Sequence, residues 1–252
     1  MRSEPEVLPA TSFPETADIE TSSDEYASRF AGPVGQWMLS VQESLTLGFV
    51  RRRAASAILD VGGGHGQLAV PLCRAGYRVT VLGSAESCQQ RIAGIVSSGA
   101  CRFQVGNVVE LPYPDRSFDT VICFRLLTHC QRWPLLIREL CRVARLDVIV
   151  DYPTSQSLNQ VAPMLFKAKK KIEGNTRTWN LFRPEEILSE FGKHGFAVAE
   201  RRAQFFLPMV LHRTLGSRAA STALERACEA LGLTQRWGSP VIVRMTREEG
   251  AP

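Results

Sequence analysis

The sequence predicts an α/β fold built on a doubly wound sheet of seven strands, mostly parallel with an antiparallel last strand, plus helical insertions. Two observations carry this prediction. Short runs rich in β-branched residues alternate with helical stretches, and a glycine cluster, Gly62–Gly66, follows the first run at once. Right-handed crossovers then place the carboxyl ends of the strands along one edge, where ligands bind. A length of 252 residues suits one such domain with additions.

The N-terminal part divides into two segments of different composition. Residues 1–23 are rich in Pro, Glu, Ser and Thr and are expected to form a disordered acidic tail. One arginine against seven acids gives residues 1–25 a charge of −6, which leaves +11 for the rest of a chain whose total is +5. Residues 24–56 are expected to form a helical cap, interrupted near Gly32–Pro33, because their apolar residues suit a partly buried helix face.

Residues 57–248 are expected to form the main domain. The predicted strands are 57–61, 78–82, 102–105, 120–124, 147–151, 197–201 and 240–245, and the predicted helices are 66–75, 85–97, 133–143, 184–194 and 218–231. Two stretches break the alternation and are expected to be insertions, at about 152–182 and 205–235. The first of them is basic and contains aromatic residues, so it is expected to cover the edge where ligands bind.

Two stretches resemble the class I S-adenosylmethionine-dependent methyltransferases, particularly the small-molecule group. Ile58–Gly66 reads ILDVGGGHG, which is similar to the family's strand–acid–x-G-x-G-x-G signature. Gly106–Ile122 resembles the family's G-D-x-x-x-L-P-F-x-D-x-S-F-D-x-V segment, and Leu126–His129 and Arg138–Val143 resemble the helix that follows. The resemblance covers about residues 57–151. It implies a Rossmann-like fold and a methyltransferase that uses S-adenosyl-L-methionine as its cofactor.

The resemblance also implies which residues bind the cofactor. Glycines after the first strand let the backbone approach a ligand closely, and a helix that begins near Gly66 would offer free N–H groups at its positive end. Asp60 would orient this loop or face the ammonium of the cofactor. The implied cofactor-binding residues are Asp60, Gly62, Gly64, Gly66, Gly83, Ser84, Asn107 and Val108.

The chain departs from the family pattern at two of these positions. Gly83 stands where the second strand normally ends in an acid that accepts hydrogen bonds from both ribose hydroxyls. Losing a charged acceptor costs about 1.5–3 kcal/mol if nothing replaces it. The candidates to replace it are Ser84, Glu86 or water. Asn107 stands where the family commonly has an Asp facing the adenine amino group, and an Asn carbonyl can still accept from that amine, while Val108 can offer its backbone N–H to the ring.

Two other functions fit parts of the same sequence. Gly64–Ala69 matches the G-x-G-x-x-A pattern of nicotinamide enzymes, but Asp60 is awkward beside a pyrophosphate and Leu111–Phe118 has no role in a dinucleotide fold. The methyl donor is therefore favoured. The second hypothesis is a degenerate methyltransferase fold that serves as a binding or scaffold subunit, and the departures at Gly83 and Asn107 motivate it.

The acceptor side is less defined by the sequence. Methyl transfer needs in-line positioning and exclusion of water, and an oxygen nucleophile also needs a base. His129 is the candidate catalytic residue because it occupies the family's histidine position after the fourth strand, with helix capping as the alternative. A basic cluster around Lys169–Lys171 would bind an anionic group on a small, partly apolar substrate. The candidate substrate-binding residues are Arg125, Tyr152, Arg177 and Trp179.

Composition disfavours several other classes. No apolar run approaches the roughly 20 residues that span a bilayer, and the acidic N-terminus lacks the apolar core of a leader peptide, so a cytoplasmic location is expected. Peripheral membrane contact is left open because apolar and basic residues adjoin in Phe205–Arg213.

Nucleic acid is disfavoured because Phe124–Leu127 lacks the Asn/Asp-Pro-Pro-aromatic motif of base methyltransferases. Seven cysteines without C-x-x-C spacing predict reduced thiols and no metal site; the oligomeric state is left unassigned.

Overall fold

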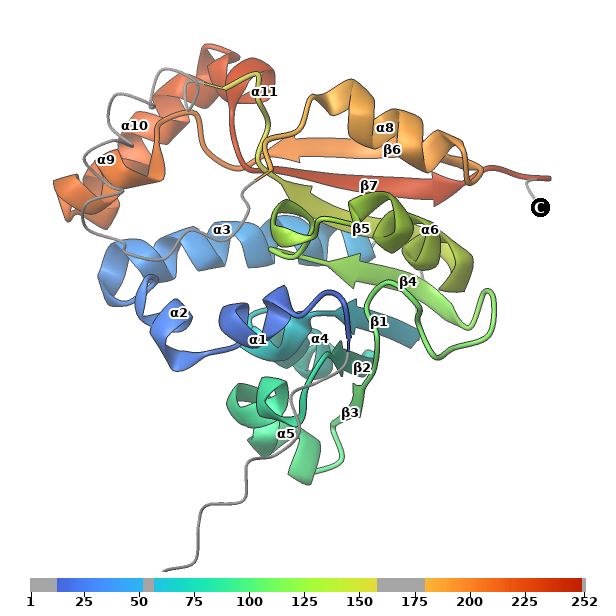
Figure 1. Ribbon diagram of the computed structural model, residues 1–252. Helices are drawn as coiled ribbons and strands as arrows, with labels where there is room; N and C mark the ends of the chain where they lie inside the picture. The colour runs from blue at the N-terminus through green and yellow to red at the C-terminus, as the bar shows by residue number, and fades with distance from the viewer. Residues whose placement is uncertain (1–12, 52–56, 158–179, 251–252) are drawn as a thin grey trace, which may run out of the picture.

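The computed structural model describes residues 13–51, 57–157 and 180–250. Its strands form one seven-stranded sheet in the order β3-β2-β1-β4-β5-β7-β6 (Figure 1). Strands β1 to β5 pair in parallel, whereas β7 runs antiparallel to both β5 and β6. The predicted fold class is confirmed. The strands are β1 (Ala57–Val61), β2 (Arg78–Gly83), β3 (Cys101–Val105), β4 (Phe118–Cys123), β5 (Ala144–Tyr152), β6 (Phe196–Ala203) and β7 (Val241–Arg247).

The core lies on both faces of this sheet, because successive side chains of a strand point to opposite faces. In β1, Leu59 packs in one cluster with α6 (Trp133–Val143) and α8 (Pro184–Gly192), while Ile58 packs in the other with α3 (Gly32–Arg51) and α4 (Ala69–Arg74). Alternate residues of β4, β5 and β7 divide between the two clusters in the same way. Both faces are therefore covered by helices, as the near-continuous apolar strands predict.

The N-terminal segment is more ordered than predicted. The disordered tail expected over residues 1–23 is wrong for the helix α1 (Ala17–Thr21), whose Ala17, Asp18 and Thr21 are buried against the sheet edge. Tertiary contacts stabilise this short helix, which polar composition alone does not predict. The expected cap follows as α2 (Asp24–Ser28) and α3, which are separate helices (Figure 1). Residues 52–56 lie outside the described ranges.

The helices after β1 and β2 begin differently from the prediction. The helix expected over 66–75 begins at Ala69, because Gly66 has φ +74 and ends a short 3-10 turn, η1 (Gly63–His65). The helix expected over 85–97 is a 3-10 segment, η2 (Glu86–Ile92), followed by α5 (Ala93–Ser97). A third 3-10 turn, η3 (Leu127–His129), follows β4.

Between β6 and β7 the chain forms the three helices α9 (Met209–Leu215), α10 (Arg218–Ala230) and α11 (Leu233–Trp237), in the region expected of the second insertion. Most of the first insertion, residues 158–179, lies outside the described ranges. All seven cysteines are described and none is in a disulfide. Within the described ranges, no helix combines the length and apolar character needed to cross a membrane.

Candidate functional site

The turn after β1 lies where the strand order reverses, between β1 and β4, which is the usual ligand position in doubly wound sheets. Gly62 and Gly66 have φ of +76 and +74, a left-handed conformation that favours glycine. A Cβ on Gly64 would lie 2.1 Å from the backbone oxygen of Cys88 and 2.5 Å from Ser22 Oγ. The turn therefore needs its glycines, some for conformation and others for space.

Asp60 lies beneath this turn and has no solvent exposure. A Cβ on Gly63 would meet the Asp60 carboxyl group at 2.1 Å, so the turn closes directly over it. Neither carboxyl oxygen has a hydrogen-bond partner among the described residues. Burial raises the pKa of Asp60 to about 7. An unpaired buried carboxyl group is costly, so Asp60 is poised to accept from a cationic or hydrogen-bonding partner.

The packing around the end of β2 explains why position 83 is a glycine and not an acidic residue. A Cβ at this position would lie 2.7 Å from Cys88 Cβ and 3.1 Å from the Phe103 ring. A carboxylate reaches the same region from α1 instead. Asp18 Oδ2 accepts a hydrogen bond from the Ser84 backbone N–H at 2.6 Å, and Asp18 Oδ1 accepts one from the Ser84 hydroxyl at 2.6 Å. The predicted substitute Glu86 is exposed and accepts from Gln89.

Asn107 and Val108 follow β3 at the same edge of the sheet. The Asn107 side-chain oxygen accepts from the Val109 backbone N–H at 3.1 Å, so it closes a local turn. Its second lone pair can still accept another donor. Val108 is fully buried in the cluster that contains Leu82.

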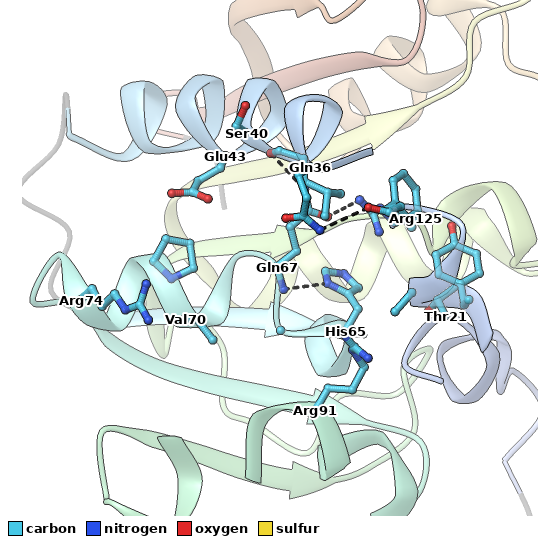
Figure 2. A pocket seen from close by; sticks show the side chains of 16 residues that line it. Thr21, Gln36, Ser40, Glu43, His65, Gln67, Val70, Arg74, Arg91 and Arg125 are labelled. Atoms are coloured by element: carbon cyan, nitrogen blue, oxygen red, sulfur yellow. Dashed lines mark hydrogen bonds between the residues drawn. The ribbon is translucent and has the colours of Figure 1, made fainter. Parts of the chain in front are cut away.

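A cavity of about 430 Å³ opens beside the glycine turn, between α2, α3 and α4 (Figure 2). Its wall combines apolar groups such as Phe30 and Leu39 with three arginines and His65. Glu43 is the acid among the residues that line it. The cavity is thus mixed in character and predominantly cationic in its charged groups.

Arg125, at the end of β4, is the best-anchored of these arginines. Its Nη2 donates to Gln42 Oε1 at 3.0 Å and to Gln67 Oε1 (Figure 2), and its guanidinium lies 4.3 Å from the centre of the Phe30 ring. The Arg125 backbone has φ +60, an uncommon conformation for a residue with a side chain, and its N–H donates to Asp151 at 2.6 Å. Strain of this kind clusters at functional sites.

His65 is a site residue that the sequence reasoning missed. Its Nδ1 accepts from the Gln67 backbone N–H at 3.2 Å, and burial, together with the charges of Arg125 and Arg91, lowers its pKa to about 3. The ring is therefore neutral with its proton on Nε2. Nε2 has no partner among the described residues and belongs to a residue that lines the cavity. Its place inside a glycine turn was the available signal.

The other predicted acceptor-side residues lie elsewhere. His129 is half-buried in η3 and is not among the residues that line the cavity, so its catalytic role stays a prediction. Tyr152 is buried in the core, with its ring 6.3 Å from that of Phe182, and is not among the residues that line this cavity, so its substrate-binding role stays a prediction. Arg177 and Trp179 lie outside the described residues.

Comparisons with known proteins agree with this geometry. Residues 59–150 match the profile of a sequence family described as "Methyltransferase domain". The matched range contains the glycine turn, the end of β2, Asn107 and Arg125, whereas the N-terminal helices that complete the cavity lie outside it.

The relatives of this chain carry related names. The chain is 28% identical over 154 residues to an O-methyltransferase, resE, of Aspergillus sclerotiorum (52% of this chain), and 31% identical over 131 residues to demethylmenaquinone methyltransferase of Deinococcus radiodurans (46% of this chain). It spans 58% and 54% of the lengths of these two relatives. The fold is similar to that of magnesium protoporphyrin IX methyltransferase from Synechocystis PCC 6803 with bound SAH, with a TM-score of 0.64 at 16% identity over 92% of this chain and 98% of that one.

Proposed function

We propose that this chain is an S-adenosylmethionine-dependent methyltransferase that acts on a small molecule. The observation that carries the proposal is the glycine turn over the unpaired, buried carboxyl group of Asp60, at the point where the strand order reverses. The relatives support the same chemistry, since both are named methyltransferases.

The residues of the turn suit this cofactor chemically. S-adenosylmethionine supplies an electrophilic methyl group on a sulfonium, and it carries an ammonium as a second cation. Asp60 is an unpaired acidic group at the end of β1, and the glycines of the turn carry no side chain that would hold a ligand away from the backbone. Asn107 can accept from an exocyclic amine through its remaining lone pair.

We propose that the cavity of Figure 2 takes the methyl acceptor. It lies at the β1–β4 edge, where Arg125 and His65 face it from the two strand ends. Phe30 and Leu39 would hold an apolar body, while Arg125 would hold an anionic or hydrogen-bond-accepting group. His65 Nε2, a donor in the neutral ring, would orient the acceptor rather than take its proton.

Calorimetric titration with S-adenosylmethionine and with S-adenosylhomocysteine tests the proposal directly. Binding of both at micromolar to low-millimolar concentration is expected, and failure to bind either at millimolar concentration would overturn the proposal. Cytoplasmic location and the exclusion of nucleic acid as substrate stay predictions.

A matched pair of variants tests where the cofactor binds. Gly64→Ala introduces a Cβ 2.1 Å from a backbone oxygen, so we expect at least about tenfold weaker binding of S-adenosylhomocysteine. Gly94→Ala makes the same change in α5, where nothing lies within 4 Å of the new Cβ, and it should bind as the unchanged protein does. Circular dichroism confirms that both variants are folded. Equal affinity of the two variants would show that the turn does not hold the cofactor.

A further inference from the structure

Helix α1 (Ala17–Thr21) lies over the ends of β1 and β2, on the glycine turn itself (Figure 1). We propose that α1 is an intramolecular competitor of the cofactor: it occupies the ribose position, and it must leave before the cofactor can bind. This inference rests on the proposed function, because the end of β2 is the ribose position only if the chain binds S-adenosylmethionine.

The contacts of α1 leave little space above the turn. A Cβ on Gly62 would lie 3.5 Å from Asp18 Cβ, which is ordinary van der Waals contact. A Cβ on Gly64 would lie 2.5 Å from the hydroxyl of Ser22, the residue after α1. On the Cβ side, Gly62 is nearest to Leu126, at 3.1 Å, and Gly64 is nearest to the Cys88 backbone oxygen, and the N-terminal segment is the next neighbour of each. A ligand that approached these glycines from that side would meet Asp18 and Ser22 of the N-terminal segment.

The Asp18 carboxylate uses the polar groups at the end of β2. It accepts from the Ser84 backbone N–H, the Ser84 hydroxyl and the Cys88 thiol, the last at 3.4 Å. A carboxylate has about four acceptor sites, so these three donors nearly saturate it. Asp18 is also fully buried, which leaves no path for ribose hydroxyls to reach it in this arrangement.

Contacts on both sides hold α1 in place, and its Ala17 packs in the core cluster that contains Leu59. Glu15 accepts from the Arg132 backbone N–H at 2.8 Å, and Asp24 forms an ion pair with Arg91. A five-residue helix has no stability of its own, so α1 depends on these contacts and can be released when they are lost. The buried hydroxyl of Ser22 and the carboxyl of Asp60 both lack partners while α1 is seated. The arrangement with α1 in place therefore leaves buried polar groups without hydrogen bonds.

The test compares S-adenosylhomocysteine binding by the full-length chain and by its Asp18→Ala variant, using calorimetry. Removing the carboxylate leaves the Ser84 donors unpaired in the seated arrangement, so the released form becomes more populated. Apparent affinity should then rise by at least about tenfold. Glu25→Ala is the control, because it removes an exposed acid from the neighbouring helix α2 with the same change of charge and should leave the affinity unchanged.

Other outcomes overturn the proposal in distinguishable ways. Weaker binding by Asp18→Ala would show that Asp18 is itself a ribose ligand. Equal affinity in the two proteins would show that α1 does not compete. Binding by neither protein would overturn the proposed function, and the competition with it.

Hydrogen exchange provides a second readout in the unaltered chain. The backbone N–H groups of Ser22 and Ser23 donate to the backbone oxygens of Asp18 and Glu20, at 2.9 Å each. The exchange of these N–H groups therefore reports on whether α1 is in place. Saturating S-adenosylhomocysteine should speed exchange across residues 17–23 if the ligand displaces α1. Slower or unchanged exchange in a protein that binds the ligand would refute the displacement.

Discussion

Asp60→Asn should change how the stability of the protein depends on pH. Burial raises the pKa of Asp60 from 3.8 to about 7. Between these values the unfolded chain has lost the proton that the folded protein still holds. The contribution of Asp60 to stability is therefore fully present below pH 3.8 and is lost as the pH rises towards 7.

The magnitude follows from the pKa shift. Each unit corresponds to about 1.4 kcal/mol, so the two units between pH 5 and pH 7 correspond to about 3 kcal/mol. Asparagine does not titrate, so the stability of Asp60→Asn relative to the unchanged protein should increase by about 3 kcal/mol between pH 5 and pH 8. Any constant cost of burying the extra amide donor cancels in this comparison.

Urea unfolding followed by tryptophan fluorescence, at pH 5, 6, 7 and 8, measures this difference. Glu25→Gln is the control, because its side chain is exposed and its stability should follow that of the unchanged protein. The contribution of Asp151, whose pKa burial raises to about 6, is common to all these proteins. A stability difference between Asp60→Asn and the unchanged protein that stays constant across the four pH values would refute the reasoning.

Two further predictions concern other parts of the fold. Glu225→Gln should lower the unfolding free energy by about 1–3 kcal/mol, because Glu225 accepts from the buried His212 ring and from the Phe206 and Leu207 N–H groups. Thermal unfolding measures this loss of stability, and an unchanged melting temperature would contradict the prediction. Arg125→Gln should raise the pKa of His65, because the Arg125 charge helps to lower it; NMR titration of the ring measures this pKa, and a fall would contradict the assigned geometry.

Much of the fold could be predicted because its strands carry a strong local pattern. Runs such as Val121–Phe124 are apolar on both faces and are bounded by polar residues, which fixes their place in the sheet. The start of α4 could not be predicted in the same way. Gly66 is compatible with a helix in sequence, and only the positive φ imposed by the preceding turn moves the helix start to Ala69.

The sequence predicted the glycine turn of the candidate site, but not the residues that contact it. The arrival of Asp18 beside Ser84 depends on a contact between residues 66 positions apart, and a polar tail gives no local sign of it. Tyr152 was assigned from its position at a strand end, but side-chain direction decided its place. His65 was within the quoted motif, yet its role depends on the hydrogen bond that sets its tautomer.

The walls of the cavity come from residues inside and residues before the range that matches the family profile. His65, Gln67 and Arg125 belong to residues 59–150, which match the family profile. Phe30, in the turn between α2 and α3, and Leu39, in α3, precede that match. The matched range supplies the glycine turn and the three arginines beside it. Residues before the matched range, from α2 to α3, close the other side of the cavity, so substitutions there would change its shape while leaving the glycine turn as it is.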